Sequence, residues 1–543
     1  MNLISRFSQA KWRLQVIARA ITCSLLFILP ACQIPDLCPA IPGPPLPAGF
    51  AAVATPDHMY GLAVLVGGVS LVMPSYVATN SESAVTPASL DSSARLGIQE
   101  FYNDPVLTDL IHQALVGNQE LRILDQDIQI AGNEILARQG AYLPFVTVGG
   151  SAGAEKPSRY TYDGAVEESL ELLPGRSFPR PLPSILGAFN FFWEVDITGK
   201  LHSARYAAIQ RYLATCEKRN YFVTTLVADV AENYYRLMAL DQRIENLNRI
   251  IALQEQSLSI AKALKDAARG TELGVQRFQG EVRKNQSEKF IVKQDIVEVE
   301  NRINFLLNRF PMPVERISAN FFDLNISALS VGIPAQLLQN RPDIVQAERE
   351  LAAAGLDVFV ARAEFFPSLS IRAGIGYQAF KPAYLFATPE ALIYNAVGEL
   401  VAPLINKKAI QANFLSANAA QLQSIYNYQR TVLNAYTEVV NRINAVENYR
   451  KSIEIKRQQL AALEASVDTA TKLFQNVRVE YIEVLFSQRD LLDARIMLID
   501  TKQQQLVATV NAYQALGGGN ILPLPPLVQP PPPPRPLHWL FHH

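Results

Sequence analysis

The residues of this chain that are able to do catalysis or metal binding are scattered and do not form a cluster. Of the six histidines, three lie in the C-terminal tail and the others, which include His112 and His202, stand alone. Asp and Glu total 50, but abundance does not create a catalytic pair of carboxylates. Cysteine is sparse and has neither zinc spacing nor the density of a disulfide framework: Cys23, Cys32, Cys38 and Cys216. The sequence therefore predicts no enzyme, no metal site and no other cofactor.

Two further features argue against a nucleotide or nucleic-acid site. The three glycines at 517–519 end a helical pattern and are not followed by Gly-Lys-Ser/Thr, so they predict a helix stop rather than a phosphate loop. The net charge of −1 provides no basic field for nucleic acid.

One cysteine has a context that predicts chemistry. Basic residues between Arg6 and Arg19 precede an apolar run at 21–31, which is shorter than the roughly 20 residues that span a bilayer. The run ends in Leu29-Pro30-Ala31-Cys32, which resembles a bacterial lipobox. We expect a signal peptide at 1–31 and lipidation of Cys32; the alternative is ordinary cleavage nearby, with Cys32 unmodified. An irregular leader follows at 32–97, and a proline-rich, disordered tail at 521–543.

The rest of the chain is an internal duplication. Gly140 to Val148 and Glu364 to Ile371 open two similar apolar runs, with prolines 223 residues apart. Val230-Ala231-Glu232-Asn233 is echoed by Glu438-Val439-Val440-Asn441 at an offset of 208, so the first half carries about fifteen extra residues. We expect repeats at 98–325 and 326–520.

Each repeat contains two candidate membrane strands, in which apolar and polar residues alternate. Such runs match transmembrane β-strands with lipid on one side and water on the other. The alternative for any single run is a half-buried strand of a soluble sandwich. The polar positions that we expect to line the lumen are Ser370, Arg372, Glu194 and Asp196.

The helical stretches are too long and too polar to lie in lipid. Residues 407–476 contain no proline and predict nearly one helix, about 100 Å long at 1.5 Å per residue. Apolar positions from Ile425 to Val446 step by three and four, as in a coiled coil. These helices must project into an aqueous compartment and pack on neighbours. Four strands do not close a barrel, so several copies must share one, because unpaired strand edges have no partners in hydrocarbon.

A series of motifs resembles one family. Ile333-Pro334-Ala335-Gln336 with Asn340-Arg341-Pro342-Asp343, and Val195-Asp196-Ile197-Thr198-Gly199-Lys200, fall in the order found in TolC-like outer-membrane factors. The resemblance extends over roughly 98–520 and is closest to the lipoprotein (NodT-like) branch that serves resistance-nodulation-division (RND) efflux.

The resemblance implies a mixed α/β membrane protein of the Gram-negative outer membrane: a homotrimer that shares a twelve-stranded barrel, four strands per chain, above a periplasmic α-helical barrel. It implies passive efflux to the exterior, with a periplasmic adaptor protein bound at the helix tips and an inner-membrane pump, of RND type, below. The expected tips are the turns Arg269-Gly270-Thr271-Glu272-Leu273 and Arg478-Val479-Glu480-Tyr481-Ile482, with the glycine of the first expected to have positive φ. Family gates carry acidic residues, for which Glu483 and the weaker Glu480 are candidates; alternatively, Glu483 is a solvated helix charge.

Two rival functions are compatible with the sequence. One is an outer-membrane duct for type I protein secretion, which shares the fold. The other is a periplasmic coiled-coil structural protein held only by a lipid anchor, which would have no membrane strands.

Overall fold

The computed structural model describes the duplicated body and part of the leader. The residues described are 34–47, 93, 96–173, 175–317, 321–324, 326 and 334–519. The expected signal peptide, the lipidation candidate Cys32 and the proline-rich tail lie outside these residues.

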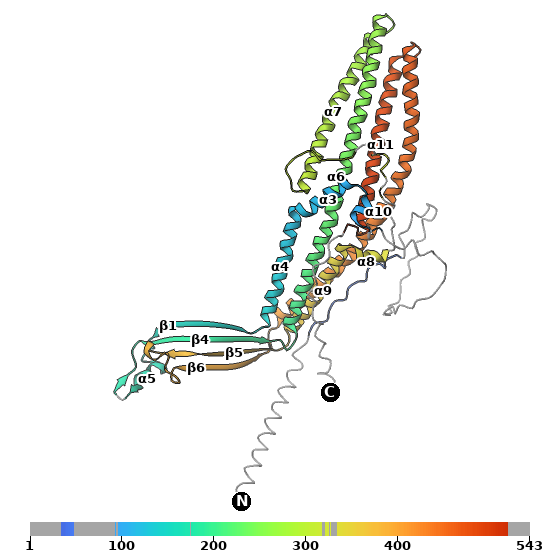
Figure 1. Cartoon of the computed structure of the whole chain (residues 1–543). Coiled ribbons are helices and arrows are strands. Elements are labelled where there is room, and N and C mark those ends of the chain that lie inside the picture. Colours follow the sequence, from blue (N-terminus) through green and yellow to red (C-terminus); the bar gives the residue numbers. More distant parts are fainter. Residues whose placement is uncertain are drawn as a thin grey trace, which may run out of the picture.

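Two long helical hairpins dominate the structure (Figure 1). The first joins α6 (Lys200–Asp266) to α7 (Glu272–Leu306), and the second joins α10 (Lys408–Gln475) to α11 (Tyr481–Ala515). The prediction of nearly one helix over 407–476 is confirmed, since α10 has 68 residues. Among the described residues, no helix is long and apolar enough to cross a membrane.

Shorter helices complete the body. In both repeats a helix of similar length packs beside the long helix on the side away from the hairpin tips: α4 has 23 residues and α9 has 22. The helices outside the hairpins are α2 (Ile98–Tyr102), α3 (Pro105–Gly117), α4 (Gln119–Ala141), α5 (Tyr162–Ser169), η5 (Pro334–Gln336), α8 (Leu337–Asn340), α9 (Pro342–Ala363) and η6 (Pro382–Tyr384).

The strands form one antiparallel sheet at the end of the body opposite the tips (Figure 1). Its order is β1-β4-β5-β6, so β1 and β6 are edges and the central pair joins the two repeats. The bounds are β1 (Phe145–Glu155), β4 (Leu182–Val195), β5 (Ser368–Ala379) and β6 (Leu392–Val401). A small hairpin, β2 (Glu171–Leu173) with β3 (Arg176–Ser177), lies in the loop before β4.

The pairing register gives the sheet two unlike faces. Ile375 lies opposite Phe189 on β4 and Tyr394 on β6, and every pair on that face is apolar or glycine. On the other face Gly374 lies opposite Asn190 and Asn395. A one-residue slip would exchange the faces, so the register is the one that keeps the predicted polar and apolar stripes continuous across all four strands.

The duplication is visible element by element. Strand, strand, long helix and 35-residue helix follow each other twice in the same order. The extra residues of the first half lie in the loop between β1 and β4, residues 156–181, which contains α5, β2 and β3, whereas residues 380–391 connect β5 to β6.

The largest core cluster lies where α2 and α3 cover α6 and α11. Phe101 stacks on Tyr513 with ring centroids 3.9 Å apart, and Tyr513 donates a hydrogen bond to the Leu96 carbonyl at 2.6 Å. Along the hairpins, α6 packs on α7 and α11, and α11 packs on α10. The helices of one chain therefore stand in the order α7–α6–α11–α10, with α7 and α10 as edges.

The segment after α7, which we call the connector (residues 307–326), crosses the hairpins. On the first hairpin Arg316 donates hydrogen bonds to Asp241 of α6 at 2.6 and 2.9 Å and to Glu300 of α7 at 2.5 Å. Phe321 is fully buried in the main core.

The connector also contacts the second hairpin. The Lys502 ammonium of α11 donates to the Leu324 carbonyl at 2.8 Å, and Arg457 of α10 donates to the Phe322 carbonyl at 3.2 Å. Burial and the neighbouring Arg457 charge lower the pKa of Lys502. The described residues of the connector thus contact all four long helices.

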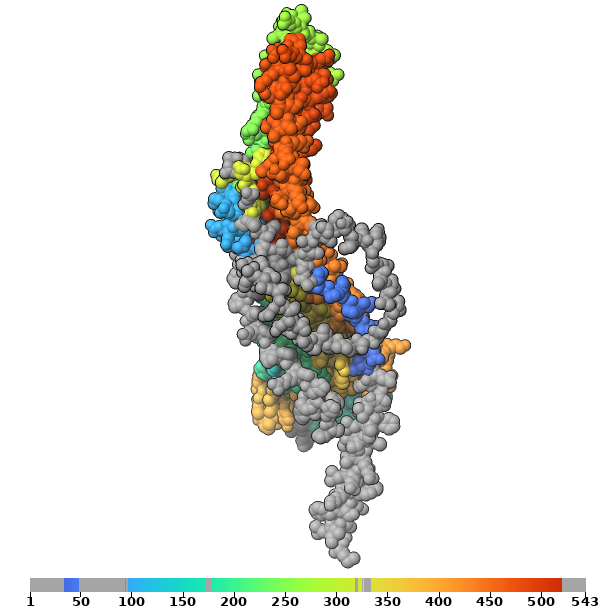
Figure 2. Space-filling view, turned by 90° about the vertical axis from the view of Figure 1, so that its right-hand side faces the viewer, coloured from blue at the N-terminus to red at the C-terminus, as the bar shows by residue number. Residues whose placement is uncertain are grey.

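Part of the leader, residues 34–47, lies along α9 and α10 (Figure 2, dark blue). Ile34 packs on the cluster of Phe365 and Phe414 where the strands meet the helices. Further along, Gln429 donates to the Ile41 carbonyl at 3.0 Å. The start of this segment is therefore held at the strand end of the body.

Candidate channel sites

Three of the four predicted lumen residues meet on the polar face of the sheet. Glu194 of β4 lies directly opposite Ser370 of β5, and Arg372 lies two positions further along the same face. The Arg372 guanidinium sits 5.6 Å from the centre of the Phe192 ring, and Glu194 pairs with Lys200 at 2.7 Å. These contacts place charged groups side by side at the end of the sheet nearest the helices.

The fourth predicted lumen residue, Asp196, does not lie on a strand, so this part of the prediction is wrong. Strand β4 ends at Val195, and Asp196 accepts hydrogen bonds from the backbone N–H of His202 at 2.9 Å and from its ring at 2.6 Å. Its side chain is only 5% exposed. The alternation of polar and apolar residues that suggested a strand continues past Val195, where β4 ends. Asp196 instead accepts hydrogen bonds from the first turn of α6.

The two predicted tips are helix-to-helix turns, with corrections to their bounds and geometry. The links run from 267 to 271 and from 476 to 480, so both predicted turns extended two residues into the following helix, α7 or α11. Gly270 is not the residue with positive φ; that residue is Ala268, at 56°. Gly270 is required for space instead, because a Cβ there would lie 3.0 Å from the backbone nitrogen of Lys265.

The tips also contact each other. Thr271 caps α7 by accepting a hydrogen bond from the Gly274 N–H at 3.2 Å. A Cβ on Gly274 would lie 3.2 Å from the Tyr481 ring, so glycine lets the first turn of α11 approach α7 closely. Between the tips lies a groove of about 380 Å³ whose lining includes Arg269, Arg478 and Val479.

The gate candidates lie beside this groove, and the structure extends the set. Glu480 is the N-cap residue of α11, and Glu483 is exposed in its first turn. Sequence reasoning stopped there, but spacing by three and four places further residues on the same helix face: Phe486, Asp490, Asp493, Met497 and Asp500.

These residues together with Glu483, which we call the acidic stripe, lie on the side of α11 away from the connector. At about 100° per residue, the acidic stripe is roughly opposite Lys502, which holds the connector. Asp500, the last of these residues, pairs with Arg243 of α6 at 2.6 Å. The periodicity of the acidic stripe is visible in the sequence. The direction in which the stripe faces is known only from the contacts of the connector on the opposite side of α11.

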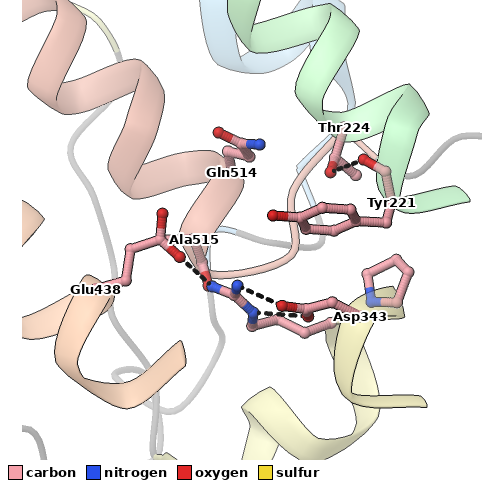
Figure 3. Close-up of a pocket in the computed structure, with 8 residues that line it drawn as sticks. Tyr221, Thr224, Asp343, Glu438, Gln514 and Ala515 are labelled. Carbon is pink, nitrogen blue, oxygen red and sulfur yellow. Dashed lines mark hydrogen bonds and ion pairs between the residues drawn. The ribbon is translucent and has the colours of Figure 1, made fainter. Parts of the chain in front are cut away.

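A buried charge cluster joins the second repeat where α9, α10 and α11 meet (Figure 3). Arg341 donates two hydrogen bonds to Asp343, at 3.0 and 2.7 Å, one to Glu438 at 3.0 Å and one to the Ala515 carbonyl at 2.8 Å. Burial alone would lower the pKa of Arg341, but Asp343 and Glu438 outweigh it and raise the pKa. Asp343 lies in the first turn of α9, which begins at Pro342 directly after Arg341.

Four strands with one apolar face, joined to hairpins about 100 Å long, define a channel subunit that lies partly in a membrane and partly in water. Solved structures share this fold. CusC matches with a TM-score of 0.71 at 24% identity, over 81% of this chain and 99% of that one. The outer-membrane channel OprN matches with a TM-score of 0.72 at 22% identity, over 83% and 99%.

Sequence comparison identifies the family. The model of the outer membrane efflux protein family matches residues 110–309 and 333–518, and the chain belongs to this family. It is the outer-membrane channel component of an efflux system. Cation efflux system protein CusC of Escherichia coli K12 is 26% identical over 429 residues, which are 79% of this chain and 90% of that protein.

Two further relatives have names that specify a lipid anchor or a different cargo. The probable outer membrane lipoprotein SilC of Salmonella typhimurium is 24% identical over 445 residues, 81% of this chain and 91% of SilC. The toluene efflux pump outer membrane protein TtgF of Pseudomonas putida is 25% identical over 430 residues, 78% and 86% respectively.

We expect Arg341→Met to lower the free energy of unfolding by about 3–5 kcal/mol, because it leaves two partly buried carboxylates without their partner. Chemical unfolding in detergent, followed by circular dichroism, measures this. The triple variant with Asp343→Asn and Glu438→Gln should recover most of the loss.

The matched control is Arg138→Met, which removes an exposed pair with Glu134. It should change stability by about 0.5 kcal/mol or less. Equal effects of Arg341→Met and Arg138→Met would contradict the assignment of Arg341 as a buried junction.

Proposed function

We propose that three copies of this chain close one twelve-stranded barrel and form a passive exit duct. The observation that carries the proposal is the sheet itself: one face is apolar throughout, yet β1 and β6 end in unpaired backbone groups. In hydrocarbon such groups are each costly, and pairing β1 of one copy with β6 of the next removes the cost.

The helices support the same arrangement. The edge helix α7 exposes Phe290 and Val297, which lie one heptad apart, with 70% and 47% of their surface accessible. The other edge helix, α10, exposes Leu433 and Ile455. Apolar edges on both sides of each chain suit packing of α7 against α10 of the next copy, in the same order as the strands.

The positions of the candidate sites support a tripartite assembly. Substrate enters between the helical hairpins, passes the polar face of the sheet at Ser370, Arg372 and Glu194, and leaves without chemistry on this chain. A periplasmic adaptor protein docks on the tips, around Arg269, Gly270, Thr271, Arg478 and Val479, and an inner-membrane pump of RND type supplies the energy. The names of CusC and TtgF specify a cation and toluene, so the shared fold serves unlike cargo.

The lipid anchor is supported by the path of the leader. Ile34, two residues after Cys32, packs beside Phe365 and Phe414 at the strand end of the body. Two residues span about 7 Å at most. An acyl chain on Cys32 would therefore start at the level where the barrel leaves the membrane, which is where it can enter lipid.

The duct predicts a stable oligomer with a pore. Purified protein should migrate as a trimer without heating, run as a monomer after boiling, and give discrete single-channel conductance in planar bilayers. The same preparation should leave dye-loaded vesicles leaky. A monomer that never inserts into vesicles would exclude the shared barrel and favour the lipid-anchored coiled-coil alternative.

Lipidation predicts a defined mature N-terminus. Mass spectrometry of protein extracted from cells should find an acylated N-terminal cysteine at position 32. Cys32→Ser should abolish the added mass, whereas Cys38→Ser, six residues on and exposed, should leave it unchanged. An intact unmodified Cys32 would contradict the anchor.

The gate predicts an effect on ion selectivity. Three copies of Glu483 would bring like charges together near the axis, where they attract cations and repel each other. Glu483→Gln should therefore lower the preference for K⁺ over Cl⁻ and reduce opening, as measured from reversal potentials in a salt gradient. Glu480→Gln should have a smaller effect, and equal effects would favour a general surface charge.

A further inference from the structure

A cavity of about 290 Å³ lies between the two hairpins on the connector side of the body. Residues of α6, α10 and α11 form its walls, and Phe322 of the connector also lines it. At about 100° per residue along α11, Arg495 in this wall falls within about 20° of Lys502 and is therefore roughly opposite the acidic stripe. The cavity, which we call the inter-hairpin pocket, is thus separate from the helix face that carries the gate candidates.

One buried side chain of the inter-hairpin pocket lacks the partners that a buried amide needs. Asn246 of α6 is only 5% exposed, and among the described residues neither its Nδ2 nor its Oδ1 has a hydrogen-bond partner. The buried amide of Asn285 differs, because it donates to Gln254 at 2.8 Å. A buried amide without partners lowers the stability of a fold. A group in the pocket that offers one acceptor and one donor would satisfy both atoms of Asn246.

The charged residues of the pocket leave one cation without a carboxylate. Glu245 pairs with Arg249, and Glu464 pairs with Arg495 at 2.5 Å. Arg457 donates to a carbonyl of the connector at 3.2 Å but has no carboxylate partner within the described part of the chain. The guanidinium of Arg457 is therefore available to an anion in the pocket.

Positive charge is concentrated at the connector end of the pocket. The Lys502 ammonium donates to the Leu324 carbonyl at 2.8 Å. Burial and the nearby Arg457 charge lower the pKa of Lys502, and Asp323 offsets part of this effect. An anion bound at Arg457 would reduce the repulsion between these two cations.

The rest of the pocket is apolar. Leu498 and Ile499 of α11 are 4% and 2% exposed, and Leu460 and Phe322 beside them are half-buried. A volume of about 290 Å³ is at the lower end of the range for small-molecule sites. The pocket therefore combines a hydrocarbon surface with a guanidinium and an unpaired amide.

We propose that the inter-hairpin pocket binds a small 2-hydroxycarboxylic acid with an apolar body. The carboxylate accepts hydrogen bonds from Arg457 and from Nδ2 of Asn246, and the adjacent hydroxyl group donates to Oδ1 of Asn246. The apolar body covers Leu498 and Ile499. Such a ligand contacts both hairpins and the connector, so its binding stabilises their arrangement. Neither a trimer nor an adaptor is required for this site.

The test uses the full chain in lipid nanodiscs, with mandelate, a 2-hydroxy acid that carries a phenyl ring, as the probe. Isothermal titration calorimetry at low salt should find saturable binding of mandelate. Phenylacetate lacks the hydroxyl group and 1-phenyl-1,2-ethanediol lacks the carboxylate. Each should bind about tenfold more weakly, or worse, because each leaves a polar group of the pocket unpaired. Equal affinities for mandelate and phenylacetate, or no detectable binding of mandelate, would overturn the proposal.

Asn246→Leu tests the amide. This variant should bind mandelate about tenfold more weakly, or worse, and should lose the preference for mandelate over phenylacetate. Its thermal unfolding midpoint should stay at or above that of the wild type, because the buried amide that it removes has no partner. The matched control is Asn285→Leu, which removes a buried amide that has a partner. That control should lower the midpoint and leave the affinity for mandelate unchanged. Wild-type affinity and selectivity in Asn246→Leu would contradict the role of Asn246.

Arg457→Gln tests the charge. It should weaken mandelate binding at low salt and flatten its salt dependence, because the ion pair that salt screens is gone. Its affinity for the uncharged diol should equal that of the wild type. The matched control is Arg450→Gln, which lies on the same helix and removes an exposed pair with Glu447, and it should leave mandelate binding unchanged. An Arg457→Gln variant that binds mandelate as the wild type does at low and high salt would rule out recognition of the carboxylate.

Discussion

The unpaired backbone of two strand edges is the constraint on which the rest of this structure depends. A four-stranded sheet with an apolar face is stable in lipid only when β1 and β6 find partners. The same chain order that leaves those strands at the edges of the sheet leaves α7 and α10 at the edges of the helical layer. One act of association therefore completes both the membrane part and the aqueous part.

Within a chain, the two repeats are held by groups that the duplication did not copy. The connector exists once, and its carbonyls at Phe322 and Leu324 are gripped by Arg457 and Lys502 of the second repeat, while Arg316 binds the first. The Arg341 junction is likewise confined to the second repeat. Between the connector and the tips, the hairpins are joined by side-chain packing and by the hydrogen bond that Gln488 of α11 donates to Ser257 of α6 at 2.9 Å.

The sequence predicted what periodicity encodes and missed what depends on three-dimensional contacts. Strand alternation predicted the faces that the register later brought into line, and the proline-free run predicted α10 to within a residue at each end. The error at Asp196 arose because alternation does not stop where the strand stops. Gly270 was assigned a backbone role because glycine usually has one there, whereas its neighbours leave no room for a Cβ.

Other features carry almost no sequence signal. Val477, in the turn after α10, has φ 58°, and nothing in the sequence distinguishes a left-handed valine from a helical one. The carboxylates at Asp490 and Asp493 were visible as a periodic stripe, but nothing in the sequence said which way the stripe faces. The role of the connector depends on contacts with residues as far as 178 positions away, which no local sequence pattern encodes.

The matched helix lengths of the two repeats determine where the chain tolerates insertions. Helices α7 and α11 both have 35 residues, and α6 and α10 have 67 and 68, whereas the connection between strands is more than twice as long in the first repeat. Inserting one residue in a long helix would rotate everything beyond it by about 100° and lift it by 1.5 Å. An insertion in the loop between two paired strands changes neither the rotation nor the rise of any long helix. The difference in length between the repeats is therefore confined to the strand loops at the cell-surface end, whereas the long helices keep matching lengths.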